Sequence, residues 1–373
     1  MPIGSGIEPA NLLPTVPYVI NPELFAAGTS PQEVPLIPLP APGPGNSVRY
    51  QLPDADVVSG LTVTFVGTLT VTAAASGQTQ PVPSDQWPYG LLSNYTLSAN
   101  GISQDLWNLD GLDLRALNFV EGRGETNNPD VFPGSEGGGG SATAAGTYPL
   151  HLTWDVNVAT SQAALVAALF CNSSQTLVSG VISQASLSEL VAPGGTSSLW
   201  AITGNFYLQE TAWTIPYSDK GEMILPDIRR LHLVAAQERP WTNTGEVSTS
   251  LLRTTGQLMR LFTSGYYAAN SPLSAIPGTA DTDKIDKWYL RYGAKSEPFE
   301  FNPASVLAAR NGRDYRSLVP GNRLVLDLML HNPARDMVML QGVTNLRVDQ
   351  VVDSAVTPTI GQATMRAVEE ILV

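Results

Sequence analysis

Apolar and polar residues alternate along several stretches of this chain, which is the pattern of a half-buried β-strand. The clearest stretch runs from Leu61 to Thr72: its odd positions are apolar apart from Gly67, and its even positions are threonine apart from Val66. Residues 150–158 and 324–330 repeat the alternation with leucine, valine or tryptophan. Because β-branched residues also favour extended backbone, these stretches predict strands with one face in a core.

Further strands are predicted between turn residues at 47–51, 92–98, 206–215, 228–235, 258–267, 337–340 and 343–351. Helical patterns are few and short. Ser161–Leu169 predicts one helix, and Asn302–Arg310 predicts another, with Asn302 as N-cap and Pro303 at the first helical position. Each helix follows a strand, so the order of elements repeats. The pattern predicts an all-β chain with a duplicated unit of roughly 150 residues.

The predicted domains follow from proline and glycine. Six prolines lie between Pro31 and Pro44, and they disfavour both a helix and a central strand. Residues 1–46 are therefore expected to form an extended arm along the surface of this subunit or of a neighbour. The loop Pro193–Ser198 marks the predicted boundary between residues 47–199 and 200–373. The glycine-rich segment Asn127–Gly146 is expected to be an exposed loop.

Composition excludes several classes of protein. The chain has 373 residues, 43% of them hydrophobic and 14% charged, so it can bury a core and is not disordered. Its net charge of −13 argues against a protein that grips phosphate backbones. The charge is uneven: residues 1–199 hold three basic and 15 acidic residues, and residues 200–373 hold 17 and 18. We see neither a signal peptide nor an apolar run of about 20 residues that could span a bilayer.

Candidate chemistry is sparse. The three histidines and the single cysteine lack the spacing of a metal site or a catalytic thiol, and Cys171 is expected to be buried. No nucleophile-elbow, P-loop or dinucleotide-binding motif occurs. The residues considered for a site are His151, His232, His331 and Cys171, the acidic groups Asp281, Asp283, Asp286 and Asp54, Asp56, and the aromatic cluster Tyr266, Tyr267, Trp288, Tyr289, Tyr292.

None of these residues forms a recognisable constellation. Lysines interleave with the Asp281 group, which favours a solvated loop, and aromatic clusters more often fill a core or a subunit interface. We therefore assign no catalytic, cofactor-binding or metal-binding residue and expect no cofactor. A long, weakly charged all-β chain with an apolar arm suits a structural building block better than an enzyme.

The order of elements resembles that of a known family. A strand at Leu150–Val158 runs into Ser161–Phe170, and Phe206–Ile215 followed by Gly221–Pro226 is similar to the opening of a second barrel. Leu324–Leu330 and Val343–Val351 match its late strands. In these features the chain resembles the double jelly-roll major capsid proteins of tectivirus-like bacteriophages, which are tailless and contain a membrane.

The resemblance implies two jelly-roll β-sandwiches in one chain, with a few short helices and an extended N-terminal arm. It implies a homotrimer of pseudo-hexagonal outline that tiles an icosahedral shell around an internal membrane. Partners would be neighbouring trimers, other capsid and vertex proteins and the viral membrane as a further candidate. Sequence-specific binding of nucleic acid is not expected. The protein would be made in the host cytoplasm and reside in the virion.

Two alternatives remain open. A carbohydrate-binding or carbohydrate-active β-sandwich would use a groove lined by aromatic residues such as Trp288, or a calcium site at Asp281. A different virion component, such as a vertex protein, would form pentamers. The family often has a helical N-terminal segment near the membrane, whereas this chain has the proline-rich arm. We expect the arm to clasp a neighbouring trimer.

Overall fold

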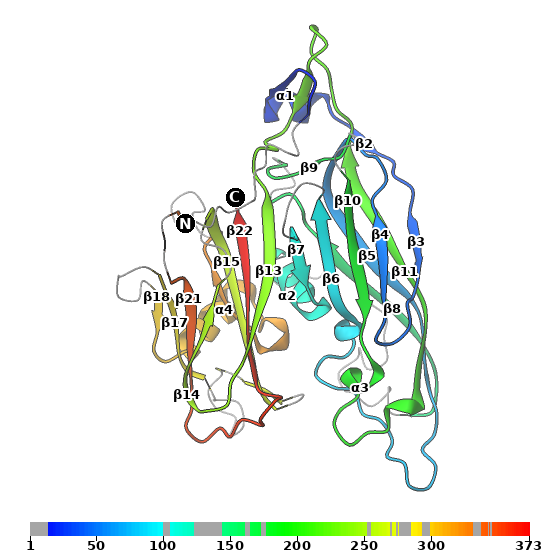
Figure 1. The fold of residues 1–373 in the computed structure, drawn as a ribbon, viewed down its shortest axis with the longest axis vertical. Coiled ribbons are helices and arrows are strands. Elements are labelled where there is room, and N and C mark those ends of the chain that lie inside the picture. The colour runs from blue at the N-terminus through cyan, green and yellow to red at the C-terminus, as the bar shows by residue number, and fades with distance from the viewer. Residues whose placement is uncertain are drawn as a thin grey trace, which may run out of the picture.

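Two β-sandwiches stand side by side in the computed structural model (Figure 1). The structure describes residues 14–99, 105–122, 144–160, 165–172, 177–251, 255–268, 271–273, 275, 285–292, 299–330, 337–341, 343 and 345–373. Among these residues, no helix is both long enough and apolar enough to cross a membrane.

The first sandwich packs two sheets face to face. One sheet contains, in spatial order, β3 (Ile37–Pro40), β11 (Trp200–Trp213), β5 (Val57–Val71) and β8 (Gly146–Val156), with the short strands β2 (Pro31–Gln32) and β9 (Leu169–Phe170) at its margins. The other contains β4 (Ser47–Gln51), β10 (Val178–Gln184), β6 (Leu92–Ala99) and β7 (Trp107–Leu109).

The second sandwich has the same plan. One sheet contains β13 (His232–Pro240), β22 (Thr364–Leu372), β15 (Gln257–Ala268) and β19 (Leu324–Asp327), with β16 (Ser271–Pro272) and β20 (Val338–Met339) also paired to β15. The other contains β14 (Gly245–Ser250), β21 (Arg347–Val352), β17 (Ile285–Arg291) and β18 (Phe299–Phe301).

The strand order is that of a jelly roll in both sandwiches. Taking the main strands of each unit in chain order, the first, eighth, third and sixth lie in one sheet, and the second, seventh, fourth and fifth lie in the other. A helix of 11 residues follows the fifth strand each time: α2 (Gly111–Glu121) after β7, and α4 (Ser305–Tyr315) after β18. The predicted duplication of an all-β unit is therefore present in the fold.

An asparagine holds each helix against the strand that follows it. In α2, the Asn118 amide donates to the carbonyl oxygen of Asp155 (2.6 Å) and accepts from the Asp155 amide (3.0 Å). In α4, Asn311 makes the same pair of bonds with Val325, at 2.7 and 2.9 Å. These two matching contacts tie α2 to β8 and α4 to β19, and they supply a residue-by-residue correspondence between the two barrels.

Each barrel has its own apolar interior, which the sequence alternation predicts. On β5, residues such as Leu61, Val63 and Phe65 point inward and the intervening threonines point outward. Trp154 on β8 and Trp288 on β17 are fully buried in the first and second interiors. The predicted strands at 150–158 and 324–330 are observed as β8 and β19, both shorter at their C-terminal ends.

The predicted boundary at residue 199 does not match the sheets. Strand β11 begins at Trp200 and pairs with β5 from Trp200 to Trp213, so it is the last strand of the first barrel. The loop at 193–198 enters this strand through a short 3-10 helix, Ser197–Leu199, and does not link two domains. A division that follows the hydrogen bonds falls between β11 and β13.

The N-terminal segment is part of the first barrel. Strand β3 pairs with β11, and its prolines are tolerated because β3 lies at the sheet edge. Upstream, β1 (Tyr18–Ile20) pairs in parallel with β12 (Met223–Leu225), and α1 (Pro22–Gly28) begins after the cap Asn21. Residues 14–46 thus contain a helix and edge strands that pair with their own chain, so the arm is not extended throughout, and its expected contact with a neighbouring trimer stays a prediction.

One of the two predicted helices is present and the other is not. The prediction at Asn302–Arg310 is confirmed, but α4 begins at Ser305 and Asn302 does not cap it. The prediction at Ser161–Leu169 is wrong where the structure describes it: Leu165 and Ala167 have φ of 48° and 66°, and β9 begins at Leu169. Residues 161–164, like residues 127–143 of the predicted glycine-rich loop, lie outside the described residues.

Candidate functional site

Buried charges gather where the two barrels meet. Strands β7 and β13 pair in parallel there, so that one sheet of each barrel joins into a continuous ten-stranded sheet. Helix α2 of the first barrel packs across the outer face of this sheet's second half, through ion pairs to residues near the start of β19 and on β15 and β22. This contact gathers several buried ion pairs and is therefore the candidate site.

Asp113 in the first turn of α2 is the centre of one group of charges. Its two carboxylate oxygens accept hydrogen bonds from Arg323 and Arg366, each at 2.6 Å. Arg366 also lies 3.1 Å from the helix cap Asp110. Burial alone would raise the pKa of Asp113, but the two arginines lower it below its ordinary value. The carboxylate is therefore ionised and links two arginines of the second barrel to the first.

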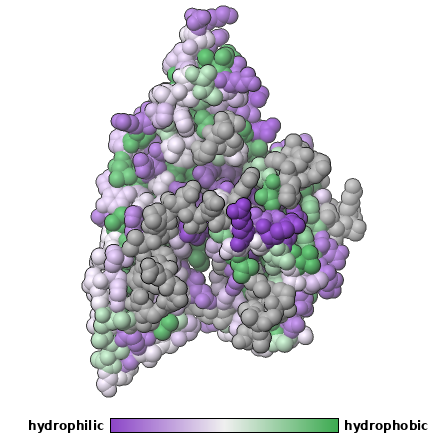
Figure 2. All heavy atoms as spheres, turned by 180° about the vertical axis from the view of Figure 1, so that it is seen from behind, coloured by the Kyte–Doolittle hydropathy of each residue, from purple (hydrophilic) through white to green (hydrophobic). Residues whose placement is uncertain are grey.

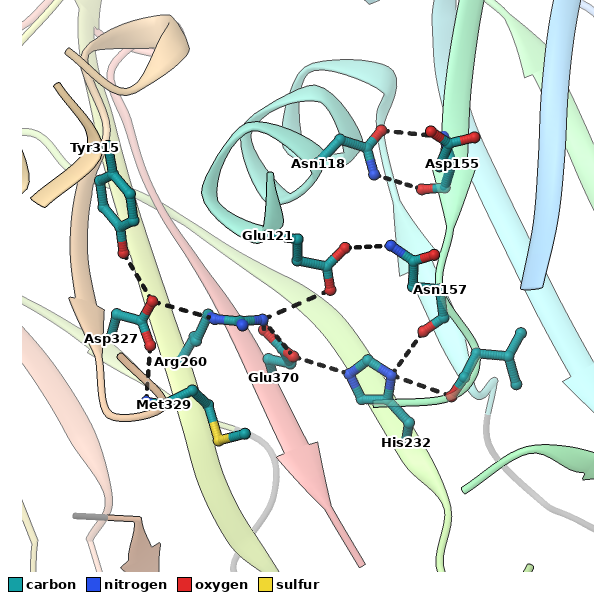
Figure 3. Close-up of polar contacts among 11 residues, drawn as sticks. Asn118, Glu121, Asp155, Asn157, His232, Arg260, Tyr315, Asp327, Met329 and Glu370 are labelled. Carbon is teal, nitrogen blue, oxygen red and sulfur yellow. Dashed lines mark hydrogen bonds and ion pairs between the residues drawn. The ribbon is translucent and has the colours of Figure 1, made fainter. Parts of the chain in front are cut away.

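Arg260 on β15 is the centre of a second group, drawn in Figure 3. Its Nη1 donates to both oxygens of Glu370 at 2.9 Å and lies 3.6 Å from Glu121, the last residue of α2. Its Nε lies 3.4 Å from Asp327, which also accepts a hydrogen bond from the Tyr315 hydroxyl (2.8 Å). The guanidinium thus joins carboxylates from α2, β22 and β19.

His232 extends this group back into the first barrel (Figure 3). Its Nδ1 lies 2.9 Å from the carbonyl oxygen of Asn157, just after β8, and its Nε2 lies 3.0 Å from Glu370. Burial would raise the pKa of Glu370, but Arg260 and the neighbouring histidine lower it to about 2. Glu370 is therefore ionised over the whole neutral range.

The buried charged groups connect the two barrels. We call this contact the joint; its members are Asp110, Asp113, Glu121, His232, Arg260, Arg323, Asp327, Arg366 and Glu370. Buried carboxylates and guanidiniums pair with one another, and pairs of this kind are costly to break because a lone buried charge remains. A cleft of about 360 Å³ opens beside the first group, between the barrels. Its charged lining, including Arg323, Arg366 and Asp110, is already engaged in these ion pairs.

The candidate site residues from the sequence do not come together in one site. His151 is exposed on β8, His232 belongs to the joint, and Cys171 is free and buried, as expected, which raises its thiol pKa. Asp56 accepts a hydrogen bond from the backbone amide of Ile215 (3.1 Å). His331, Asp281 and Asp283 lie outside the described residues. Among those described, no three acidic, histidine or cysteine residues form a group that could hold a metal ion.

The aromatic cluster is divided between interior and surface. Trp288 is buried and donates from Nε1 to the Thr263 hydroxyl at 2.9 Å, and Tyr289 is also buried. Only Tyr266 borders the cleft between the barrels. Trp288 thus stabilises the second barrel and does not form the sugar-binding groove that the carbohydrate alternative required.

Sequence reasoning missed the joint. Its members are far apart along the chain: Asp113 and Arg366 are separated by 253 residues. One local signal existed in the largely apolar C-terminal segment 363–373: Arg366 and Glu370 stand four positions apart, and therefore on one face of a strand, while Glu369 lies on the opposite face. That pattern indicates a strand buried on both sides.

Solved structures share the fold of this chain over nearly its whole length. The major capsid protein of Sulfolobus turreted icosahedral virus aligns with a TM-score of 0.64 and 16% identity, over 93% of this chain and 96% of that one. The chain folds as a double jelly roll. The Faustovirus major capsid protein aligns at 0.56 and 10% identity, over 93% and 90% of the two chains. The major capsid protein P2 of bacteriophage PM2 aligns at 0.50 and 13%, over 91% and 97%.

The predicted resemblance is thus confirmed at the level of the fold. No protein-family model matches the chain, and no curated protein matches it either. In this double jelly roll, the ion pairs around Arg260 and Arg366 connect the first barrel to the second.

Proposed function

We propose that this protein is a major capsid protein, a structural subunit whose copies build an icosahedral viral shell. The observation that carries the proposal is the double jelly roll itself. It spans more than nine-tenths of the chain in alignment with the capsid protein of Sulfolobus turreted icosahedral virus. The protein would reside in the virion and act without a cofactor.

The joint between the barrels supports this role. A shell subunit must present its side faces at constant angles, because small errors accumulate around a closed lattice. Buried ion pairs and a shared sheet hold the two barrels in one orientation. The charged groups at the joint pair with one another. They therefore suit a role in holding the barrels in place better than a role in catalysis.

The assembly would be a homotrimer in which six barrels form a pseudo-hexagonal ring. Such trimers would contact neighbouring trimers and vertex proteins in the shell. An internal membrane remains a candidate partner. With a net charge of −13, direct and sequence-specific binding of nucleic acid is not part of the proposal.

The test is the native mass of the purified protein by light scattering, with electron microscopy of the same peak. The monomer mass is 39.7 kDa, so a trimer would have about 119 kDa, three times that value. A trimer of hexagonal outline, or closed shells, supports the proposal. A pentamer would indicate a vertex protein. A monomer that never assembles overturns the proposal.

A further inference from the structure

The outer face of α2 is buried, whereas the equivalent face of α4 is exposed. Counted from Asn118, Asp113 lies five residues upstream in α2; counted from Asn311, Val306 lies five upstream in α4. Asp113 is 3% exposed because the second barrel covers it, but Val306 is 53% exposed.

The next turn of each helix shows the same contrast. Leu117 in α2 is 1% exposed, and its counterpart Arg310 has a side chain that is 34% exposed. Arg313, one turn further along the same face of α4, is 70% exposed. Two helices with one role in the fold thus differ in whether a neighbouring barrel covers them.

The surface that receives α2 also has an uncovered counterpart. Within the chain, α2 lies on the outer face of the sheet formed by β13, β22, β15 and β19. The equivalent sheet of the first barrel is formed by β3, β11, β5 and β8, and its outward side chains are largely exposed. We name the outward residues of β11, β5 and β8 the threonine face.

The threonine face has the composition of an interface between subunits. Its outward positions are Thr62, Thr64, Val66, Thr68 and Thr70 on β5, Thr147, Pro149, His151, Thr153 and Asp155 on β8, and Ala201, Thr203, Asn205, Tyr207, Gln209 and Thr211 on β11.

Only one of these residues, Asp155, carries a formal charge at pH 7, and charge depletion is typical of interface cores. Neighbouring hydroxyls hydrogen-bond to each other, as in Thr68 and Thr203 at 3.1 Å. Figure 2, seen from behind, shows the lobe of the first barrel largely in pale colours of intermediate hydropathy.

The size of the threonine face suits a stable contact. Three strands about 4.8 Å apart, each contributing about 11 residues at 3.3 Å, cover roughly 500 Å². A standard interface buries about 800 Å² on each partner. The face can therefore supply more than half of one interface, and flanking loops would supply the remainder.

We propose that α4 of one copy lies on the threonine face of a second copy, repeating between chains the contact that α2 makes within the chain. The proposal rests on the capsid function above and names the surfaces that its assembly uses. The contact is head to tail: each copy offers one helix and one face, so the contact can propagate around a ring.

Charge supports this choice of partner. The exposed face of α4 carries Arg310 and Arg313, and Arg316 follows the helix. Most of the barrel that receives it lies in residues 1–199, which hold three basic and 15 acidic residues. Hydroxyl and amide oxygens on the threonine face can accept hydrogen bonds from guanidinium groups. A basic helix therefore meets an acidic barrel across an uncharged surface.

The first experiment is a cross-link between copies. Because the only native cysteine, Cys171, is buried, Val66→Cys and Val306→Cys would be prepared as separate variants, mixed during assembly and treated with a short bis-maleimide. We expect a cross-link between residues 66 and 306 of different chains, identified by mass spectrometry. Ile360→Cys, at a residue that is 81% exposed and outside both surfaces, replaces Val66→Cys in the control mixture.

The second experiment uses charge. Val66→Lys and Arg313→Glu should each lower the association constant at least tenfold, and the double variant should recover part of the loss because the two introduced charges are opposite and attract each other across the contact. Arg229→Glu, at an exposed arginine remote from both surfaces, is the matched control.

The outcomes separate the two proposals. If the wild-type protein forms trimers but the 66–306 cross-link does not exceed the control, the contact is wrong and the capsid function stands. If the wild-type protein remains a monomer under all assembly conditions, the proposed function itself fails. Variants with a circular dichroism spectrum unlike the wild type are replaced by Val66→Gln and Arg313→Ala, with the same readout.

Discussion

Single residues at the joint hold charges that are shared among several buried partners. Arg366 lies against Asp113 and Asp110, and its side chain is only one-fifth exposed. Removing one member of a buried pair leaves the other as an unpaired charge in a medium of low polarity. The loss of one such side chain is therefore expected to cost more stability than the loss of an exposed charge.

We expect Arg366→Ala to lower the free energy of unfolding by about 3–5 kcal/mol, because Asp113 and Asp110 lose a shared cation. Chemical denaturation followed by tryptophan fluorescence measures the change. Arg229→Ala is the matched control, since Arg229 pairs with Asp227 at the surface, where such pairs contribute less than about 1 kcal/mol. Equal losses in the two variants would contradict a role for the buried group.

Glu210 on β11 is a buried charge of another kind. Both of its carboxylate oxygens are buried without a hydrogen-bond partner among the described residues. Burial raises the pKa of Glu210 from 4.5 to about 7. The folded state therefore keeps a proton between pH 4.5 and 7 that the unfolded chain releases, so the free energy of unfolding falls as pH rises through this window.

We expect Glu210→Gln to remove this dependence and to be more stable than the wild type at pH 8, by up to about 3 kcal/mol. Urea denaturation at pH values from 4.5 to 8 measures the effect. Glu23→Gln, at an exposed position of α1, should follow the wild-type curve. A wild-type protein whose stability rises from pH 5 to 7 more steeply than that of the variant would refute the prediction.

At the scale of elements, local pattern predicted strands better than helices. Alternation identified β5 because each threonine points out and each apolar residue points in. The alanine-rich stretch at residue 161 has high helical propensity, yet Leu165 and Ala167 adopt left-handed backbone conformations. Helix α2 was missed because it is buried on both sides, so that no polar face marks its period.

The asparagine that clamps each helix is expected to act locally. Asn118→Ala leaves the backbone amide and carbonyl of Asp155 without partners, and Asn311→Ala does the same at Val325. Each should cost about 1–3 kcal/mol. Hydrogen exchange should accelerate in β8 for the first variant and in β19 for the second. Asn243→Ala, at an exposed site between β13 and β14, should change neither strand.

At the scale of the molecule, the sequence predicted two related units but not where they divide. The loop at 193–198 resembles a linker, yet β11 returns after it to pair along the whole of β5. Pairing between strands that lie more than a hundred residues apart has no signature in a local window. The ion pairs of the joint are equally non-local, so the candidate site was found only in three dimensions.

The shared sheet and the joint should make the two barrels unfold together. We expect peptides from β5 and from β17 to gain deuterium at the same denaturant concentration, because the barrels are coupled through β7, β13 and the charges of α2. In Arg366→Ala, the two transitions should separate. Hydrogen exchange with mass spectrometry measures both. Separate transitions in the wild-type protein would show that the barrels are independent.

The opposite charge of the two helices has a consequence for crowded, newly made chains. Before the barrels of one chain pack together, α4 of another chain could compete with α2 for the sheet formed by β13, β22, β15 and β19. The product would be two wrongly assembled chains. Arg323 and Arg366 of the second barrel receive the carboxylate of Asp113 from α2, whereas α4 has the apolar Val306 at the equivalent position and cannot supply that charge. The charge of the helix therefore distinguishes α2 from α4 at this sheet. Each chain can then pack its own two barrels together before it contacts another chain.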